Sequence, residues 1–394
     1  MNNFSFHNPT RIYFGKGQLA KLDEAAPRDG VILMLYGGGS IKRNGVYDQV
    51  RQALGARTVL EYGGIEANPT YETLMPAVEM ARREGVTFLL SVGGGSVLDG
   101  VKFVAAAIPF DDEPWGIVAK GVKPQSAVPL GAVLTLPATG SEMNAFAVIS
   151  RTATREKLSF GSPHVYPRFS ILDPETTFSL PERQVANGIV DAFTHVVEQY
   201  LTYPTQAPLH DRLAESILQT LIEIGPRTLT DPTDYDSRAA LMWCATMALN
   251  GIIGSGVPHD WATHRIGHEL TVLYGLDHAR TLAVVLPSLW HLQRDGKRAK
   301  LLQYAERIWG LTDGDDDARI DDAIARTAAF FESLGVPSRL ANYPDVTPDA
   351  PATVAHRLAA RNAVPLGERR DITADRVREI LAHSLAADHA FSTA

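Results

Sequence analysis

Cysteine is almost absent from this sequence: Cys244 is the single one among 394 residues. One thiol permits no internal disulfide and no cysteine-rich metal cage, which fits a reducing cytoplasm. The first residues, MNNFSFHNPTRIYFGKG, lack a basic segment followed by an apolar stretch, and no uninterrupted apolar run reaches about 18 residues. We therefore expect a cytoplasmic protein that is neither exported nor inserted into a membrane.

Positive charge is in deficit, because 37 Lys and Arg stand against 45 Asp and Glu, for a formal net charge of -8. Nucleic acids and anionic membranes are bound mostly through lysine and arginine, so neither is expected as the main partner. Apolar residues are plentiful: 45% of the chain is hydrophobic and 21% is charged. That composition excludes disorder, and the length suggests two domains or one large one.

The first half of the chain alternates apolar, β-branched runs with amphipathic stretches. The apolar runs predict strands at residues 31–36, 56–62, 86–92, 132–140 and 170–174. Residues 71–85 and 96–107 between them have the apolar spacing of helices. This βαβ pattern predicts that residues 1–180 form an α/β domain with a mostly parallel sheet and helices on its faces.

From Pro181 onward the periodicity is helical, with few β-branched runs. Residues 181–394 are therefore predicted to form an all-helical domain. Its last amphipathic stretch, residues 371–391, has Asp371 or Thr373 as the expected N-cap. The acidic run TDGDDDARIDDAI predicts a solvated loop and a helix start.

Two of the predicted strands end in the same tetrapeptide, GGGS, at residues 37–40 and 93–96. Glycines let the backbone approach a ligand closely, and free amides at the start of a following helix can face a phosphate. Neither turn is G-x-G-x-x-G, and one GGGS alone could be a simple tight turn. Two copies at the carboxyl ends of strands, where α/β folds bind ligands, favour a nucleotide site.

The first glycine turn also indicates which dinucleotide binds. An NAD site normally places an acidic side chain on the adenosine ribose, and YGGGSIKRNG offers none. Ser40, Lys42 and Arg43 could instead accept a 2'-phosphate, which an acid would repel. NADP(H) is therefore favoured over NAD(H), although Lys42 and Arg43 taken singly could lie on an ordinary solvated helix face.

Asp191 and His195 stand four residues apart in a helical segment whose opposite stripe is apolar. This spacing places both side chains on one face of the helix. Taken alone, the segment predicts a surface helix on which Asp191, His195 and Glu198 are solvated.

Histidine gathers in a second segment, residues 260–280, where His264 and His268 stand four apart and His278 follows a Gly-Leu-Asp turn. One carboxylate and several imidazoles on two helices and a loop form a nitrogen and oxygen set suited to Zn²⁺ or Fe²⁺. A satisfied core histidine is the alternative for each residue taken singly. A metal that also binds substrate takes at most four protein ligands, so one imidazole would remain as a proton relay.

Four longer stretches resemble the iron-containing (group III) alcohol dehydrogenases: GGGSVLDGVKFVA, LTLPATGSEMNAFAVIS, ILDPETTFSLPERQVANGIVDAFTHVVEQYLT and GVPHDWATHRIGHELTVLYGLDHARTLAVVLP. The similarity spans practically the whole chain and is greatest to bacterial NADPH-dependent, broad-range aldehyde reductases and butanol dehydrogenases. It implies a dehydroquinate synthase-like architecture, with a dinucleotide-binding domain at residues 1–180, a helical domain at 181–394, and metal and substrate between them. It also implies a homodimer or a larger assembly.

The resemblance assigns roles to individual residues. It places the metal ligands at Asp191, His195, His264 and His278, and a further histidine near the nicotinamide at His268. Cofactor contacts are expected at Gly37, Gly38, Ser40, Asn68, Gly94, Gly95, Ser96, Asp99, Thr135, Thr139, Ser141 and Lys157. NAD-preferring members carry Asp where this chain has Gly38, which agrees with the charge argument for NADP(H). Ala67, where the branch usually has Pro, puts no catalytic residue in doubt.

The expected reaction is reversible hydride transfer between NADP(H) and small aldehydes or primary alcohols at one divalent metal ion. His268 would relay the proton. A lyase of the dehydroquinate synthase type would need a cluster of basic residues beside the histidines, and a zinc hydrolase would need the glutamate of H-E-x-x-H. Neither feature is present in the sequence, whereas a catalytically silent nucleotide-binding module stays open. The sequence also leaves open the physiological aldehyde, the choice of Zn or Fe, and the strictness of the NADP preference.

Overall fold

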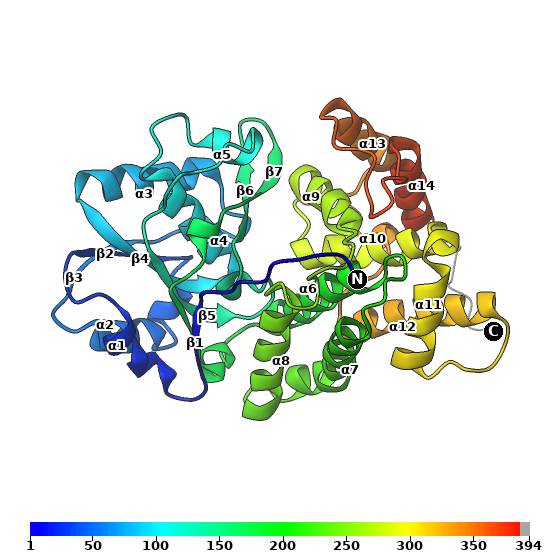
Figure 1. Cartoon of the computed structure of the whole chain (residues 1–394), viewed down its shortest axis with the longest axis horizontal. Helices are drawn as coiled ribbons and strands as arrows, with labels where there is room; N and C mark the ends of the chain where they lie inside the picture. The colour runs from blue at the N-terminus through cyan, green and yellow to red at the C-terminus, as the bar shows by residue number, and fades with distance from the viewer. Residues whose placement is uncertain (387–394) are drawn as a thin grey trace. The chain divides into compact units, whose positions relative to one another are not determined.

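The computed structural model describes residues 1–386, so the end of the predicted C-terminal helix, residues 387–391, lies outside the described residues. The chain divides into two compact units, each with its own helices (Figure 1). The α/β unit comprises His7–Pro181 and Asp231–Asn250. The helical unit comprises Met1–Phe6, Glu182–Thr230 and the chain from Gly251 onward.

A six-stranded parallel sheet lies at the centre of the α/β unit, in the order β1-β8-β5-β4-β2-β3. The strands are β1 (Arg11–Phe14), β2 (Val31–Tyr36), β3 (Thr58–Tyr62), β4 (Val86–Gly94), β5 (Leu130–Leu136) and β8 (Phe169–Leu172). All of them except β1 coincide with apolar runs that predicted strands. The predicted α/β fold with a mostly parallel sheet is confirmed.

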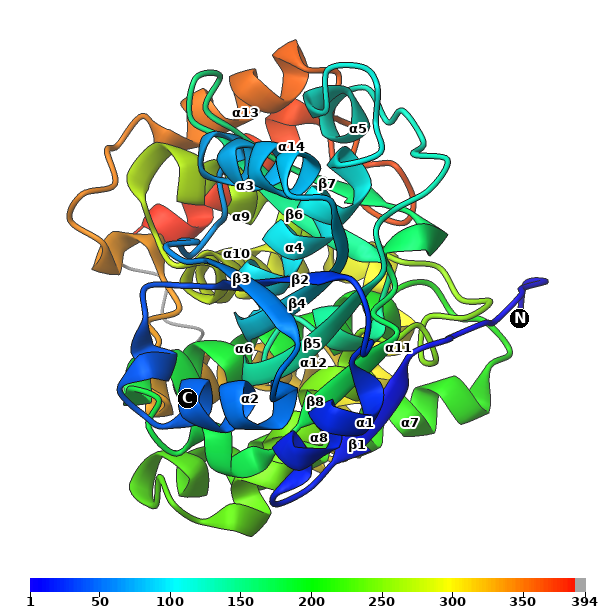
Figure 2. The same ribbon diagram turned by 90° about the vertical axis from the view of Figure 1, so that its left-hand side faces the viewer.

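The two faces of this sheet bury alternate side chains beneath different helices. Leu33 and Leu35 of β2 join the core under α3, α4 and α5, whereas Ile32 and Met34 join the core over α1 and α2 (Figure 2). Successive side chains of a strand point to opposite faces, so a sheet covered on both sides requires continuous apolar strands. These helices are α1 (Leu22–Ala25), α2 (Val46–Leu54), α3 (Tyr71–Arg83), α4 (Gly95–Ala107) and α5 (Trp115–Ala119).

Some elements of the α/β unit were not anticipated. The edge strand β1 has four residues, and β6 (Phe146–Arg151) and β7 (Glu156–Gly161) form a separate antiparallel hairpin with mixed exposure. Short or half-exposed strands lack the continuous apolar run that marks a buried one. Helix α8 (Tyr235–Ala248) also belongs to this unit, where Met242 packs with Leu134 and Leu172.

The helical unit surrounds a central helix, α10, which is buried from Thr281 through Trp290. It packs against α6, α9, α12 and α14 (Figure 1). Between Glu182 and Ala386 the structure has helices and no strand, apart from an isolated bridge between Leu366 and Ile372, so the predicted helical C-terminal region is confirmed. The helices of the unit are α6 (Glu182–Tyr200), α7 (Pro208–Thr230), α9 (Ala262–Tyr274), α10 (His278–Leu292), α11 (Arg294–Trp309), α12 (Asp316–Ser333), α13 (Ala350–Ala360) and α14 (Ala374–Leu385).

Polar side chains cap helices of this unit as the sequence predicts. Thr373 accepts a hydrogen bond from the amide of Arg376 at 3.3 Å and caps α14, so Thr373 rather than Asp371 is the N-cap. Asp315, in the acidic run, accepts from the amide of Ala318 at 2.8 Å and caps α12. Among the described residues, no helix combines the length and the apolar character needed to cross a membrane.

Candidate metal and nucleotide sites

Helix α6 carries Asp191 and His195 into the interior of the helical unit. Every residue from Val185 to Tyr200 is buried, so the polar stripe is covered as fully as the apolar stripe opposite it. The alternative of a solvated surface helix is therefore wrong. Asp191 is 3% exposed and His195 is 4% exposed, and a carboxylate at that depth requires a charged or hydrogen-bonding partner.

Imidazoles from α9 and α10 lie opposite these two side chains. His264 and His268 are one helical turn apart on α9, and both are buried. Helix α9 ends at Tyr274 and is followed by Gly275, whose φ of 67° is in the left-handed region that favours glycine. The chain then turns and begins α10 with His278, which brings a third imidazole back toward α6.

The turn before His278 is tied to α6 by a charged residue. Asp277 accepts hydrogen bonds from Nε of Arg183 at 2.8 Å and from Nδ2 of Asn187 at 2.9 Å. These partners lower the pKa of Asp277, although its burial alone would raise it. An ionised Asp277 therefore holds the start of α10 against the helix that carries Asp191.

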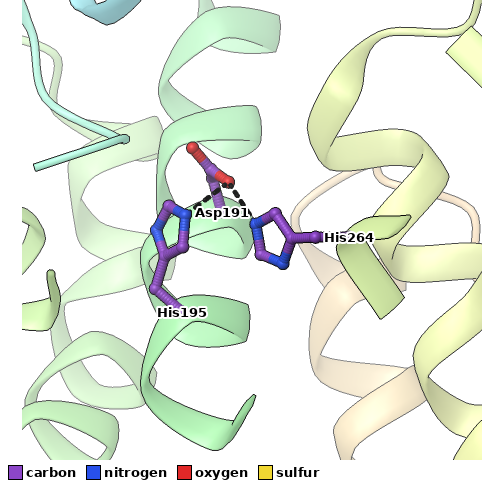
Figure 3. A group of neighbouring side chains, drawn as sticks. All are labelled: Asp191, His195 and His264. Carbon is purple, nitrogen blue, oxygen red and sulfur yellow. Dashed lines mark ion pairs between the residues drawn. The ribbon is translucent and has the colours of Figure 1, made fainter. Parts of the chain in front are cut away.

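Three imidazoles converge on one carboxylate oxygen. The distances to Oδ1 of Asp191 are 3.7 Å from Nε2 of His195, 3.8 Å from Nε2 of His264 and 3.6 Å from Nε2 of His278. The ligand atoms of Asp191, His195 and His264 all lie within 4.8 Å of one another (Figure 3). Tetrahedral ligands at about 2.0–2.2 Å from one ion are separated by about 3.3–3.6 Å, so the three distances to Oδ1 of Asp191 exceed the spacing around a single cation by about 0.2 Å at most.

Unsatisfied buried atoms point to the same position. Oδ1 of Asp191 and Nε2 of His264 are buried and have no hydrogen-bond partner among the described residues. Burial would raise the pKa of Asp191, but the neighbouring imidazoles hold it below the usual range. Burial would likewise lower the pKa of His264, but Glu198 and Asp191 raise it to about 9. The buried carboxylates therefore favour a positive charge at this position, which a proton or a metal ion can supply.

The mutually close set holds Asp191, His195 and His264, so both His278 and His268 lie outside it. His268 lies beside the other imidazoles. Its ring centroid lies 6.4 Å from that of His264, with the two rings nearly perpendicular at 89°. It lies 5.5 Å from the ring centroid of His278. The structure therefore brings three of the five predicted residues mutually close, with Nε2 of His278 at 3.6 Å from Oδ1 of Asp191 and the ring of His268 beside that of His278.

Two neighbours of the cluster were missed by sequence reasoning. Glu198, judged to be solvated, contacts Nδ1 of His264 and accepts the amide of Thr263 at 2.7 Å. Glu198 follows His195 by three residues, a spacing that places both on one face of the helix and could have indicated its position beside the cluster. The ring of Trp261 packs edge-on against that of His264, with 5.4 Å between the ring centroids, and Trp261 has a left-handed φ of 60°. No pattern in the sequence predicted either feature.

In the α/β unit, the second glycine turn joins β4 directly to α4. A Cβ atom at Gly95 would lie 2.2 Å from Oγ1 of Thr139, so only glycine fits there. No side chain caps the N-terminus of α4. The first amides of this 13-residue helix can therefore serve an anionic group.

The first glycine turn follows β2, the strand adjacent to β4. A Cβ at Gly37 would lie 3.1 Å from the carbonyl oxygen of Ile65, whereas one at Gly38 would meet nothing within 4 Å. Gly39 has a left-handed φ of 85° and leads into a short 3-10 helix that starts at Ser40. The two predicted turns thus lie at the carboxyl ends of neighbouring parallel strands.

Several other predicted cofactor residues lie close together around α4. Nζ of Lys157 donates to Oδ1 of Asn68 at 2.7 Å, and the amide of Asn68 donates to Oγ of Ser96 at 3.4 Å. On the next turn of α4, Asp99 accepts from Oγ of Ser141 at 2.7 Å. Thr139 accepts the amide of Ser141 at 3.2 Å, and Thr135 is buried on β5.

Lys42 has specific partners near the first turn. Its Nζ lies 3.4 Å from Oε2 of Glu61 and 4.8 Å from the ring centroids of both Tyr36 and Tyr47. Tyr47 donates to the other oxygen of Glu61 at 2.6 Å. The sequence suggested either a phosphate ligand or a solvated lysine, and the structure shows an exposed cation held by one acid and two rings.

Two sequence profiles and several relatives match this chain. Residues 9–174 match the profile of iron-containing alcohol dehydrogenase, and residues 185–385 match the C-terminal profile of the Fe-containing alcohol dehydrogenase family. The NADPH-dependent aldehyde reductase YqhD of Escherichia coli (strain K12) is 59% identical over 96% of this chain and 99% of that protein.

Solved structures agree with the profiles. A crystal structure of YqhD from E. coli has a TM-score of 0.96 at 58% identity, covering 98% of this chain and 99% of that one. NADH-dependent butanol dehydrogenase A of Thermotoga maritima has a TM-score of 0.93 at 34% identity, covering 98% and 99%. The chain belongs to the iron-containing alcohol dehydrogenase family.

Proposed function

We propose that this chain is a metal-dependent oxidoreductase that transfers hydride between NADP(H) and small aldehydes or primary alcohols, acting mainly as an aldehyde reductase. The observation that carries the proposal is the convergence of His195, His264 and His278 on one oxygen of the buried Asp191. The 59% identity to an NADPH-dependent aldehyde reductase supports the reaction and the coenzyme.

The donor set fits a divalent cation. One carboxylate and three imidazoles are ligands that both Zn²⁺ and Fe²⁺ accept, and Asp191, His195, His264 and His278 would hold the ion. When bound, the ion acts as a Lewis acid that polarises the carbonyl oxygen and stabilises the negative charge that develops there. The buried carboxylate of Asp191 supplies the only formal negative charge among these four side chains.

His268 is the residue we propose for proton transfer. The residue is 7% exposed and lies one turn beyond His264 on α9, with its ring centroid 5.5 Å from that of His278. A histidine can give up and regain a proton near neutral pH, which the alcohol oxygen requires once hydride has reached the carbonyl carbon. Its removal should slow turnover and leave the metal in place.

The two glycine turns are the proposed dinucleotide site. The uncapped amides at the start of α4 suit a pyrophosphate, and Gly38 leaves open space where an acid would repel a 2'-phosphate. Ser40, Lys42 and Arg43 follow in the same turn and can pair with that phosphate. NADP(H), when bound, supplies or accepts the hydride.

The test is steady-state kinetics with NADPH and NADH over propanal through hexanal, run with elemental analysis of the purified protein. We expect oxidation of NADPH with each aldehyde, a higher kcat/KM for NADPH than for NADH, and about one Zn or Fe ion per chain. A metal-loaded protein that oxidises neither coenzyme would overturn the proposal. Binding of NADPH without oxidation on adding butanal would indicate a silent nucleotide-binding module instead.

We also propose a cytoplasmic homodimer in which residues 1–180 bind the coenzyme and residues 181–394 bind the metal. The resemblance to the family and the single cysteine support this arrangement. Light scattering should give twice the mass of one chain, and a monomer or a larger assembly would correct the proposal.

A further inference from the structure

Glu198 is a buried carboxylate that the proposed chemistry does not use. It lies on α6, one turn beyond His195, and its side chain is 1% exposed. We propose that Glu198 is a positioning residue for the metal site: it holds Nδ1 of His264, so that Nε2 of the same ring is presented to the cation. This inference rests on the metal site of the proposed function.

Glu198 binds three groups at the start of α9. Its Oε1 accepts the amide of Thr263 at 2.7 Å, its Oε2 contacts Nδ1 of His264, and its backbone carbonyl accepts the amide of Asp260 at 2.8 Å. The first amides of a helix lack partners within the helix, and a carboxylate there is favoured by the helix dipole. The contact therefore fixes both the start of α9 and one ring that α9 carries.

The contact also determines which nitrogen of His264 faces Asp191. A carboxylate can only accept a hydrogen bond, so Nδ1 must be the donor. In the neutral ring, Nε2 then carries a lone pair, which lies 3.8 Å from Oδ1 of Asp191. Two buried lone pairs facing each other are unfavourable unless a cation lies between them. The contact with Glu198 therefore orients the Nε2 lone pair of His264 for metal binding, because metal-bound histidines generally donate their second N–H to an outer carboxylate or carbonyl.

A purely structural role for Glu198, as an anchor of α9, would predict a different response to Glu198→Gln. The glutamine keeps the shape, and its amide oxygen can still accept from Thr263. Its NH₂ group then faces Nδ1 of His264 and can only donate, which moves the ring proton to Nε2, where the metal should bind. An anchor would lose little from this change, whereas a metal site would lose a ligand.

The first experiment measures Zn²⁺ affinity of the full-length protein by competition with a chelator. Glu198→Gln should bind Zn²⁺ about 10- to 100-fold more weakly than the wild type. The matched control is Glu215→Gln, another buried carboxylate of the helical unit, which accepts from Tyr200 at 2.8 Å and from Arg307 at 2.9 Å. The control should bind Zn²⁺ like the wild type, even where its thermal stability is lower.

The second experiment needs no folded variant of Glu198. Nitrogen NMR of ¹⁵N-histidine in the Zn²⁺-loaded wild type should show that His264 has a protonated Nδ1 and a metal-bound Nε2. Assignment of the His264 ring through its own backbone signals identifies the peak, because a variant of this ligand should lose the metal. A metal-bound Nδ1, or equal Zn²⁺ affinity of the wild type and Glu198→Gln, overturns the inference and leaves the proposed function standing. A wild type that binds no Zn²⁺ or Fe²⁺ overturns the metal site of the proposed function, and the inference with it.

Discussion

Gly95→Ala tests the nucleotide site through a steric conflict that the structure defines. The added Cβ would lie 2.2 Å from Oγ1, 2.6 Å from Cγ2 and 2.9 Å from Cβ of Thr139. Ordinary contacts begin at 3.4 Å, so the first turn of α4 and Thr139 must separate by about 1.2 Å. Thr139 cannot simply rotate its hydroxyl away, because Oγ1 accepts the amide of Ser141 at 3.2 Å.

The size of this shift sets the expected effect. Overpacking of this kind costs about 1–3 kcal/mol of folding stability. A displacement of about 1.2 Å also lengthens an amide-to-phosphate hydrogen bond of about 2.9 Å beyond bonding range. Loss of one or two such bonds to a charged group, at about 1.5–3 kcal/mol each, weakens NADPH binding at least tenfold. Metal content should not change, because all of the proposed ligands belong to the helical unit.

The assay for Gly95→Ala is titration of the purified protein with NADPH, followed by coenzyme fluorescence, together with elemental analysis. Gly116→Ala is the matched control, since it lies on α5 of the same unit and its added Cβ would have Val122 at 3.8 Å as the nearest neighbour. Wild-type NADPH affinity in Gly95→Ala would refute the assignment of the α4 N-terminus as the phosphate site.

The remaining predictions address the metal, the proton, the coenzyme and pH. His264→Ala should lose bound metal and activity together, and full metal content would contradict its role as a ligand. His268→Gln should retain the metal and lower kcat about 100-fold or more, so an unchanged kcat would exclude it as the relay. Lys42→Ala should raise KM for NADPH about tenfold with little change for NADH, and equal effects on both coenzymes would argue against a 2'-phosphate contact. Burial lowers the pKa of Lys102 to about 8, whereas an unfolded lysine titrates near about 10.4, so the unfolded chain binds more protons between these values. The free energy of unfolding of the wild type should therefore rise from pH 8 to 10 relative to that of Lys102→Met. Urea denaturation at several pH values measures this difference. The same dependence of unfolding free energy on pH in both proteins would contradict the prediction.

The sequence predicted the sheet where burial imposes a simple pattern. Strands β2, β4, β5 and β8 are covered on both faces, so they read as continuous apolar runs. Strand β1 is short and lies at an edge, and the hairpin of β6 and β7 is partly exposed, so neither has such a run. Periodicity also identified α8 as helical without indicating that its Met242 packs in the core of the α/β unit.

The candidate site shows a second limit of the same kind. The spacing of Asp191 and His195 predicted a shared helix face, and the structure places both opposite His264. The same helix was expected to expose Glu198, because amphipathicity within one helix cannot show whether another helix covers its polar side. In the structure, α9 covers the polar side of α6, and its residues His264 and Thr263 contact Glu198.

The most direct measurement is anomalous diffraction from crystals of the Zn²⁺- or Fe²⁺-loaded protein, recorded at the absorption edge of the metal. We predict one strong peak within about 2.0–2.2 Å of a carboxylate oxygen of Asp191 and of Nε2 of His195, His264 and His278. A peak elsewhere in the chain, or one that these side chains do not bind, would contradict the account.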